Sequence, residues 1–154
     1  MAALAVVAAV MEPVTALGNW QYTRWGMTLV QVVAASHGTA WLTEDNGSYL
    51  RYMPNRDKAL LLAKGQVAID NLQFLVGFYF DTVTRRLVNV FLTLDPCSKT
   101  DAYEIKRLLA IKYGSPRATF YDLTAEWVSP LSPDIITFVA SSCSISYKPV
   151  PAGL

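Results

Sequence analysis

The sequence has few of the residue types on which metal centres and catalytic sites depend. Its 154 residues include one histidine and two cysteines, which are too few for a zinc site built from those ligands. Charged residues make up only 16% of the chain, against about 25% in an average globular protein. The 13 Lys and Arg nearly balance the 12 Asp and Glu, so the net charge of +1 excludes a protein held on nucleic acid by phosphate contacts.

Catalytic motifs are missing as well. The chain has no GxSxG nucleophile elbow, no GxGxxG loop and no Walker sequence. His37 is the single candidate base, and it stands before Gly38, where a cation at a helix end complements the helix dipole. We therefore expect His37 to cap a helix rather than to act in a hydrolase, and we expect no enzyme activity, cofactor or metal. Glu44, Asp45 and Asp57 follow no EF-hand spacing, which predicts a solvated loop.

Apolar residues, in contrast, make up 53% of the chain. This share is enough to bury a sizeable core and excludes intrinsic disorder. The length fits one ordinary domain.

The N-terminus carries an uncharged apolar run, Ala2–Val10. The run is far shorter than the roughly 20 residues of a membrane span, but it matches the 7–15-residue core of a secretory signal. Pro13 follows, and small residues then allow cleavage after Ala16 or Gly18. The pattern predicts a signal peptide over residues 1–16. Because no Lys or Arg precedes the run, a start codon assigned too late and a buried core helix are the alternatives.

Export would leave one mature domain over residues 17–154, without a transmembrane span, in the periplasm or outside the cell. Such compartments are oxidising, and Cys97 and Cys143 suffice for one structural disulfide there. A pair of buried thiols is the alternative.

Two helices are predicted from the signals at their ends. Thr28 and Gln31 have the spacing of a capping box, and Gly38 accepts the left-handed conformation that ends a helix. A second helix follows Ser98, carries apolar residues at helical spacing, and ends in the basic, Gly- and Pro-containing sequence 112–116.

Alternating apolar residues predict six strands. A strand over 59–69, interrupted at Gly65, precedes a hairpin made of residues 73–80 and 88–94. Three further strands are expected at 125–129, 135–140 and 144–148.

A weak internal repeat aligns Val32–Ala40 with Leu108–Pro116. Each of these helix–glycine units precedes three of the expected strands. The sequence therefore predicts an α+β fold of two α-β-β-β modules, at about residues 20–94 and 95–150. Their antiparallel strands would form one sheet with both helices on one face.

Three short motifs resemble those of uncharacterised exported bacterial proteins. They are a WGMT helix start at Trp25–Thr28, a KYGxP helix end at Lys112–Pro116 and an SCxIxY last strand at Ser142–Tyr147. This resemblance covers most of the mature chain and implies export but no known activity.

The helix start at Gly26–Val32 also resembles that of small outer-membrane-assembly lipoproteins of the SmpA/OmlA type. Those domains, like the tandem modules of β-lactamase inhibitor protein, pair short helices with an antiparallel meander. The lipoprotein pattern fails here at the lipid anchor, since no cysteine stands at the expected mature N-terminus. Neither resemblance transfers a functional residue.

Aromatic residues are the remaining functional signal. Trp20 and Trp25 belong to an alternating aromatic stretch, which packs in the core or anchors a partner. Tyr49, Arg51 and Tyr52 lie in a polar segment and have the composition of binding hot spots. We expect a non-catalytic protein-interaction or envelope-associated module that binds another envelope protein through these five residues. A small-ligand or lipid-binding carrier in the periplasm is the alternative, because the predicted sheet has a Phe-rich face.

Overall fold

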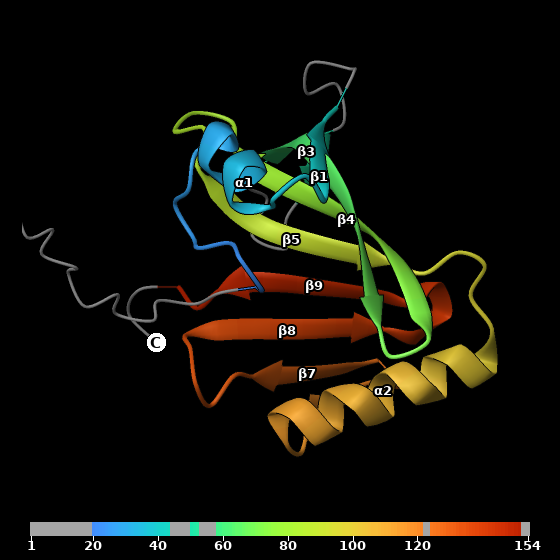
Figure 1. Cartoon of the computed structure of the whole chain (residues 1–154). Coiled ribbons are helices and arrows are strands. Elements are labelled where there is room, and N and C mark those ends of the chain that lie inside the picture. The colour runs from blue at the N-terminus through green and yellow to red at the C-terminus, as the bar shows by residue number, and fades with distance from the viewer. Residues whose placement is uncertain (1–19, 44–49, 53–57, 122–123, 152–154) are drawn as a thin grey trace, which may run out of the picture.

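The computed structural model describes residues 20–43, 50–52, 58–121 and 124–151, and within them the chain has an α+β fold (Figure 1). The two α-helices of this part are α1 (Leu29–Ala35) and α2 (Lys99–Tyr113). The strands are β1 (Ala40–Leu42), β2 (Leu50–Tyr52), β3 (Lys58–Ile69), β4 (Leu72–Asp81), β5 (Leu87–Thr93), β6 (Ala118–Thr119), β7 (Ala125–Val128), β8 (Asp134–Val139) and β9 (Ser144–Pro149).

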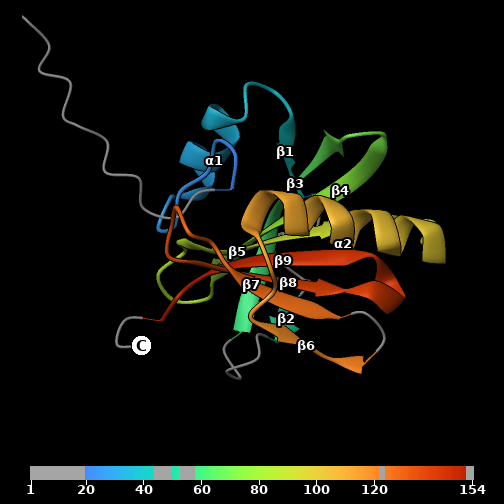
Figure 2. The same ribbon diagram turned by 90° about the horizontal axis from the view of Figure 1, so that it is seen from below.

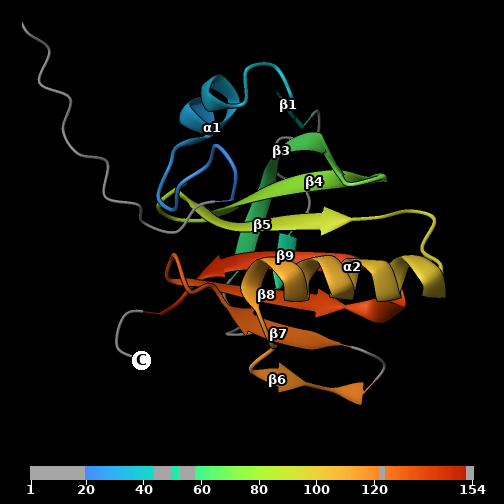
Figure 3. The ribbon, with the colours of Figure 1, turned by 60° about the horizontal axis from the view of Figure 1, so that its bottom comes forward.

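These strands form one antiparallel sheet. The order is β1-β3-β4-β5-β9-β8-β7-β6, and β2 pairs with β3 beside this path. The expected hairpin is confirmed as β4–β5, and the three later strands are confirmed as β7, β8 and β9. The strands β3–β5 and the strands β7–β9 meet where β5 pairs with β9, for example at Val90 and Tyr147. Figure 3 shows β5 and β9 side by side near the middle of the sheet.

The first helix begins at the predicted capping box but ends differently from the prediction. The backbone N–H of Gln31 donates to Thr28 Oγ1 at 3.3 Å, and the backbone N–H of Thr28 donates to the side-chain Oε1 of Gln31 at 2.8 Å. The side chain that closes the other end is Ser36, whose hydroxyl donates to the Val33 carbonyl at 2.7 Å. His37 follows this C-cap residue at a φ of 49°, so the side-chain hydrogen bond at the helix end comes from Ser36, and the dipole interaction expected for His37 stays a prediction.

The second helix is confirmed at both ends. Ser98 and Asp101 cap its first turn reciprocally, and Gly114 ends it at a φ of 83°. Just before the N-cap, Cys97 forms the predicted disulfide with Cys143, which immediately precedes β9. The bridge therefore fixes the start of α2 to the sheet.

Gly65 does not interrupt its strand, contrary to the sequence prediction. The strand β3 runs through it without a break, and Gly65 pairs with Ala40 on one side and Val76 on the other. A Cβ atom at Gly65 would lie 2.9 Å from the carbonyl oxygen of Thr39. The glycine is required because the chain entering β1 passes this close to β3.

The core lies on one face of the sheet. Phe74, Val76, Phe78 and Phe80 alternate along β4 and are buried. Buried residues of both helices belong to the same apolar cluster, among them Val32 of α1 and Ile105 and Leu109 of α2. Figure 3 shows α2 lying over the part of the sheet that contains β8 and β9, and Figure 2 shows the same helix alongside β9. No helix in the described part of the chain is long and apolar enough to cross a membrane.

Candidate functional site

Trp25 anchors the N-terminal segment to the sheet. Its indole Nε1 donates to Asp134 Oδ1 at 2.6 Å, and the Ser132 hydroxyl donates to Asp134 Oδ2 at 2.6 Å. Asp134 is only 3% exposed, so both donors satisfy a carboxylate that would otherwise be buried without partners. The geometry gives Trp25, which is half-buried, a structural role across 109 residues of sequence.

Trp20 packs in the core. Its ring is 4% exposed and makes edge contacts with Phe78 at 5.9 Å and Tyr22 at 6.0 Å between centroids. This matches the core-packing interpretation of the aromatic stretch and leaves little of Trp20 for a protein partner. One side of the residue lines a cleft described below.

The three predicted loop residues are only partly described. Arg51 and Tyr52 lie in β2, where their backbones pair with Ala59 and Lys58 of β3. Tyr49 lies outside the described residues, as do Glu44, Asp45 and Asp57. The pairing puts β2 next to β1 along β3, because β1 pairs with residues 63–65 of the same strand.

A cleft of about 270 Å³ lies between α2 and the sheet, and we call it the α2 cleft. It is formed by the segment before α1, the end of β3, the first half of β4, the inner side of α2, and β9. The apolar residues of its lining include Trp20, Ile69, Phe74, Ile105, Leu108 and Ile145.

Three polar side chains line this cleft, Gln21, Lys112 and Tyr147. Tyr147 is buried, and burial raises the pKa of its hydroxyl well above the ordinary value, with smaller contributions from Tyr113, including a hydrogen bond, and from Asp134. The Tyr147 phenol is therefore neutral at physiological pH. Lys112 is the one charged residue in the described lining, and its Nζ lies 5.1 Å from the centre of the Tyr113 ring.

A second apolar depression, of about 300 Å³, lies on the other face of the sheet, and we call it the β4 groove. It crosses β1, β3, β4 and β5. Trp41 and Leu75 are 46% and 53% exposed beside it, and half-buried Phe91 and Tyr79 also line it. A Cβ on Gly77 would lie 2.9 Å from the Tyr79 ring, which therefore lies over the glycine backbone.

Two side chains of opposite charge line the β4 groove. Lys64 and Asp95 are both exposed there, and Lys64 stands between Trp41 and Gly77 in the sheet register. The site therefore combines apolar side chains with one cation and one anion.

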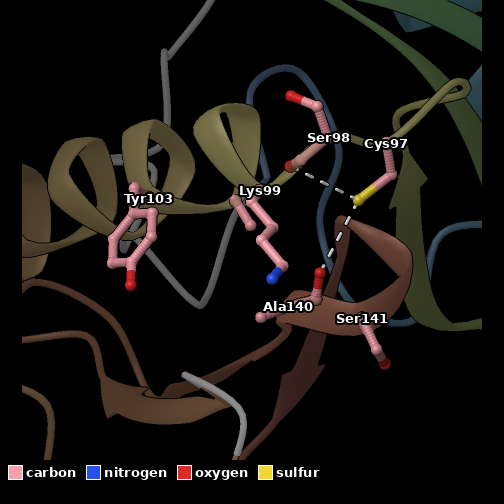
Figure 4. Close-up of a pocket in the computed structure, with 7 residues that line it drawn as sticks. Cys97, Ser98, Lys99, Tyr103, Ala140 and Ser141 are labelled. Carbon is pink, nitrogen blue, oxygen red and sulfur yellow. Dashed lines mark hydrogen bonds between the residues drawn. The ribbon is translucent and has the colours of Figure 1, made fainter.

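A third pocket opens at the disulfide and is shown in Figure 4. Cys97, Ser98, Lys99 and Tyr103 of the α2 N-terminal region face Ala140 and Ser141 across it. The polar side chain that points at the helix start, Asp101, is already used by the capping box of Ser98. This pocket has no buried, unpaired side chain that would select a ligand.

The described residues hold no cluster of three or more His, Cys, Asp or Glu side chains that suits a metal ion. His37, the candidate base, is exposed after α1. Chemically, the described surfaces are suited to binding.

Comparison of the chain with protein families, with curated proteins and with solved structures found no match.

Sequence reasoning missed most residues of both surfaces. The alternation along 73–80 did place Leu75, Gly77 and Tyr79 on the face opposite the phenylalanines, and this was the available signal for the β4 groove. Trp41 reaches the β4 groove because β1 pairs with β3, and Lys112 reaches the α2 cleft because α2 packs on the sheet. Both arrangements bring together residues that are far apart in the sequence.

Proposed function

We propose that the protein is an exported, non-catalytic module that binds another envelope protein through the β4 groove. The observation that carries this proposal is the exposure of two large apolar side chains, Trp41 and Leu75, beside the same depression. Large apolar side chains exposed together on a surface are typical of a protein-binding site.

The mixed charge of the lining favours a polypeptide as the occupant. Lys64 and Asp95 would match a partner segment that carries an acidic and a basic residue among apolar ones. A membrane surface or a nucleic acid would instead favour positive charge alone. The aromatic lining agrees with this, since aromatic residues are enriched at the centres of protein interfaces.

Site-specific photocrosslinking tests the proposal. A photoreactive amino acid at position 75, in the protein exported by its host, should crosslink to one envelope protein. The same amino acid at position 83 is the control, because Val83 is 86% exposed in the β4–β5 turn and does not line the groove. We expect Trp41→Ala to abolish the crosslink from position 75.

A crosslink of equal yield from both positions, or one that survives Trp41→Ala, would contradict the proposal. Alanine substitution at Tyr49, Arg51 and Tyr52 tests the predicted loop separately. If the partner stays bound after those three changes, the loop is not part of its binding site. Circular dichroism of each variant checks that the fold is retained.

Export is part of the proposal and is supported by the Cys97–Cys143 disulfide. The intact mass of the protein from its native host tests it. We expect a mass that begins at Leu17 or Asn19, with two thiols that become alkylatable only after reduction. A full-length mass with free thiols would overturn the export hypothesis.

We further propose that the domain consists of two α-β-β-β modules, whose three-strand meanders are β3–β5 and β7–β9, with both helices on one face. The strands β1, β2 and β6 are additions to these modules. Several features support this architecture. Thr28 and Ser98 each begin a helix with a capping box, and Gly38 and Gly114 follow the helices at φ angles of 89° and 83°. The strand order also fits two meanders joined at β5 and β9.

The carrier function is the second candidate, and the α2 cleft favours it. The cleft is apolar and lies between a helix and a sheet, which is a common place for a small-ligand site. Native mass spectrometry of the exported protein should then show a retained small molecule that is lost after denaturation. A protein mass without any adduct would count against this function.

A further inference from the structure

We propose that the α2 cleft binds a single-chain fatty carboxylate, with the chain between α2 and the sheet and the carboxylate at Lys112. This inference rests on the carrier function proposed above and adds the chemical class of the ligand. It concerns a surface on the opposite face of the sheet from the β4 groove.

The size of the cleft limits the ligand to one short chain. Its volume of about 270 Å³ is slightly below the roughly 300–1,000 Å³ of typical small-molecule sites. If each methylene group occupies about 30 Å³, the volume that one molecule takes in liquid water, the cleft holds about nine carbons. A lipid with two acyl chains is too large.

The lining determines where the chain lies. Trp20 and Phe74 provide ring surfaces, and Ile105, Leu108 and Ile145 provide aliphatic ones. The inner part of the cleft therefore offers apolar contact on several sides. Each methylene removed from water there contributes about 0.8 kcal/mol, or close to fourfold in affinity.

The charge of the lining determines which head group is favoured. Lys112 supplies a positive charge, and the described lining contains no Asp or Glu. The other polar side chains of the lining, Gln21 and the neutral Tyr147, add no negative charge. An anionic head group near Lys112 is therefore favoured over a neutral one, and a cationic head group is disfavoured.

The experiment uses isothermal titration calorimetry with decanoate and with decanol, which has the same chain without the charge. We expect decanoate to bind more tightly. Because Lys112 is exposed, its charge is partly screened, and Lys112→Gln should weaken decanoate binding about two- to fivefold. The same substitution should leave decanol binding unchanged.

Matched variants on α2 separate the cleft from the rest of the helix. Lys106→Gln removes a charge that does not line the cleft and should leave decanoate binding unchanged. Leu108→Trp fills the cleft and should abolish binding, whereas Ile111→Trp adds the same ring at a position that is 69% exposed. Thermal unfolding of each variant confirms that it is folded.

The outcomes distinguish this inference from the carrier function. Equal binding of decanoate and decanol, with no effect of Lys112→Gln, would overturn the anionic head group while the carrier function stands. Binding that survives Leu108→Trp would overturn the α2 cleft as the site. If neither ligand binds and native mass spectrometry shows no adduct, the carrier function fails together with the inference.

Discussion

Opening the Cys97–Cys143 disulfide should destabilise the protein substantially while leaving its fold in place. The bridge joins the residue before the α2 N-cap to the residue before β9, and the two cysteines are 46 positions apart in sequence. In the unfolded chain it prevents this long segment from extending. The folded chain gains little from the bridge beyond the contacts that α2 already makes.

The magnitude follows from the length of the closed loop. Chain-entropy arguments give about 4 kcal/mol for a loop of this size at 25 °C. For a chain of about 150 residues, each kcal/mol corresponds to roughly 2–4 °C in Tm, so reduction should lower Tm by about 8–16 °C. The denaturant m-value should rise on reduction, because the unfolded chain then exposes more surface.

The assay compares guanidinium unfolding of the oxidised protein, the reduced protein and Cys97→Ala/Cys143→Ala. Reduction opens the loop but keeps both sulfur atoms, whereas the double substitution also removes the sulfur of the fully buried Cys143. The variant should therefore be less stable than the reduced protein by a cavity term. Equal unfolding midpoints and m-values before and after reduction would refute the reasoning.

Three further experiments test other parts of the structure. In a double-mutant cycle of Trp25→Phe and Asp134→Ala, we expect a coupling of about 1.5–3 kcal/mol from their hydrogen bond, and additive losses would contradict it. Burial raises the pKa of the Tyr147 hydroxyl, so its stabilising contribution is complete below about pH 10 and is lost as the pH rises through the folded value. Unfolding measured from pH 8 to pH 11 should show a smaller alkaline loss in Tyr147→Phe, and identical pH curves would exclude this role. Gly65→Ala should cost about 1–3 kcal/mol in chemical denaturation, because the new Cβ meets a backbone carbonyl at 2.9 Å.

The elements whose signals lie in adjacent residues of the sequence could be predicted. The Thr28–Gln31 capping box, the stop signal of α2, the hairpin of β4 and β5, and the strands β7, β8 and β9 are fixed by short-range patterns that the structure confirms. The predicted break at Gly65 was wrong, because the cause of the glycine is the backbone of Thr39, which lies beside it only after the sheet forms. The strand order was likewise unavailable, since it depends on pairing between β5 and β9.

The candidate sites were harder to predict than the fold. The aromatic pattern singled out Trp20 and Trp25 as candidate binding residues, but a tryptophan can pack, donate a hydrogen bond or face a partner, and its sequence neighbours do not decide which. For Trp25 the deciding group is Asp134, a residue 109 positions away. Lys112 likewise becomes notable only because α2 lies over β9 and leaves a cleft between them.

The two candidate surfaces can be tested independently because they use opposite sides of one sheet. Along β4, Phe74 lines the α2 cleft and its neighbour Leu75 lines the β4 groove. This follows from the two-residue period of a strand. A substitution at Leu75 therefore changes the groove without adding or removing atoms in the cleft, and a substitution at Leu108 does the reverse. If decanoate changed the crosslink from position 75, the effect would have to pass through the sheet itself, and ligand and partner would be thermodynamically coupled.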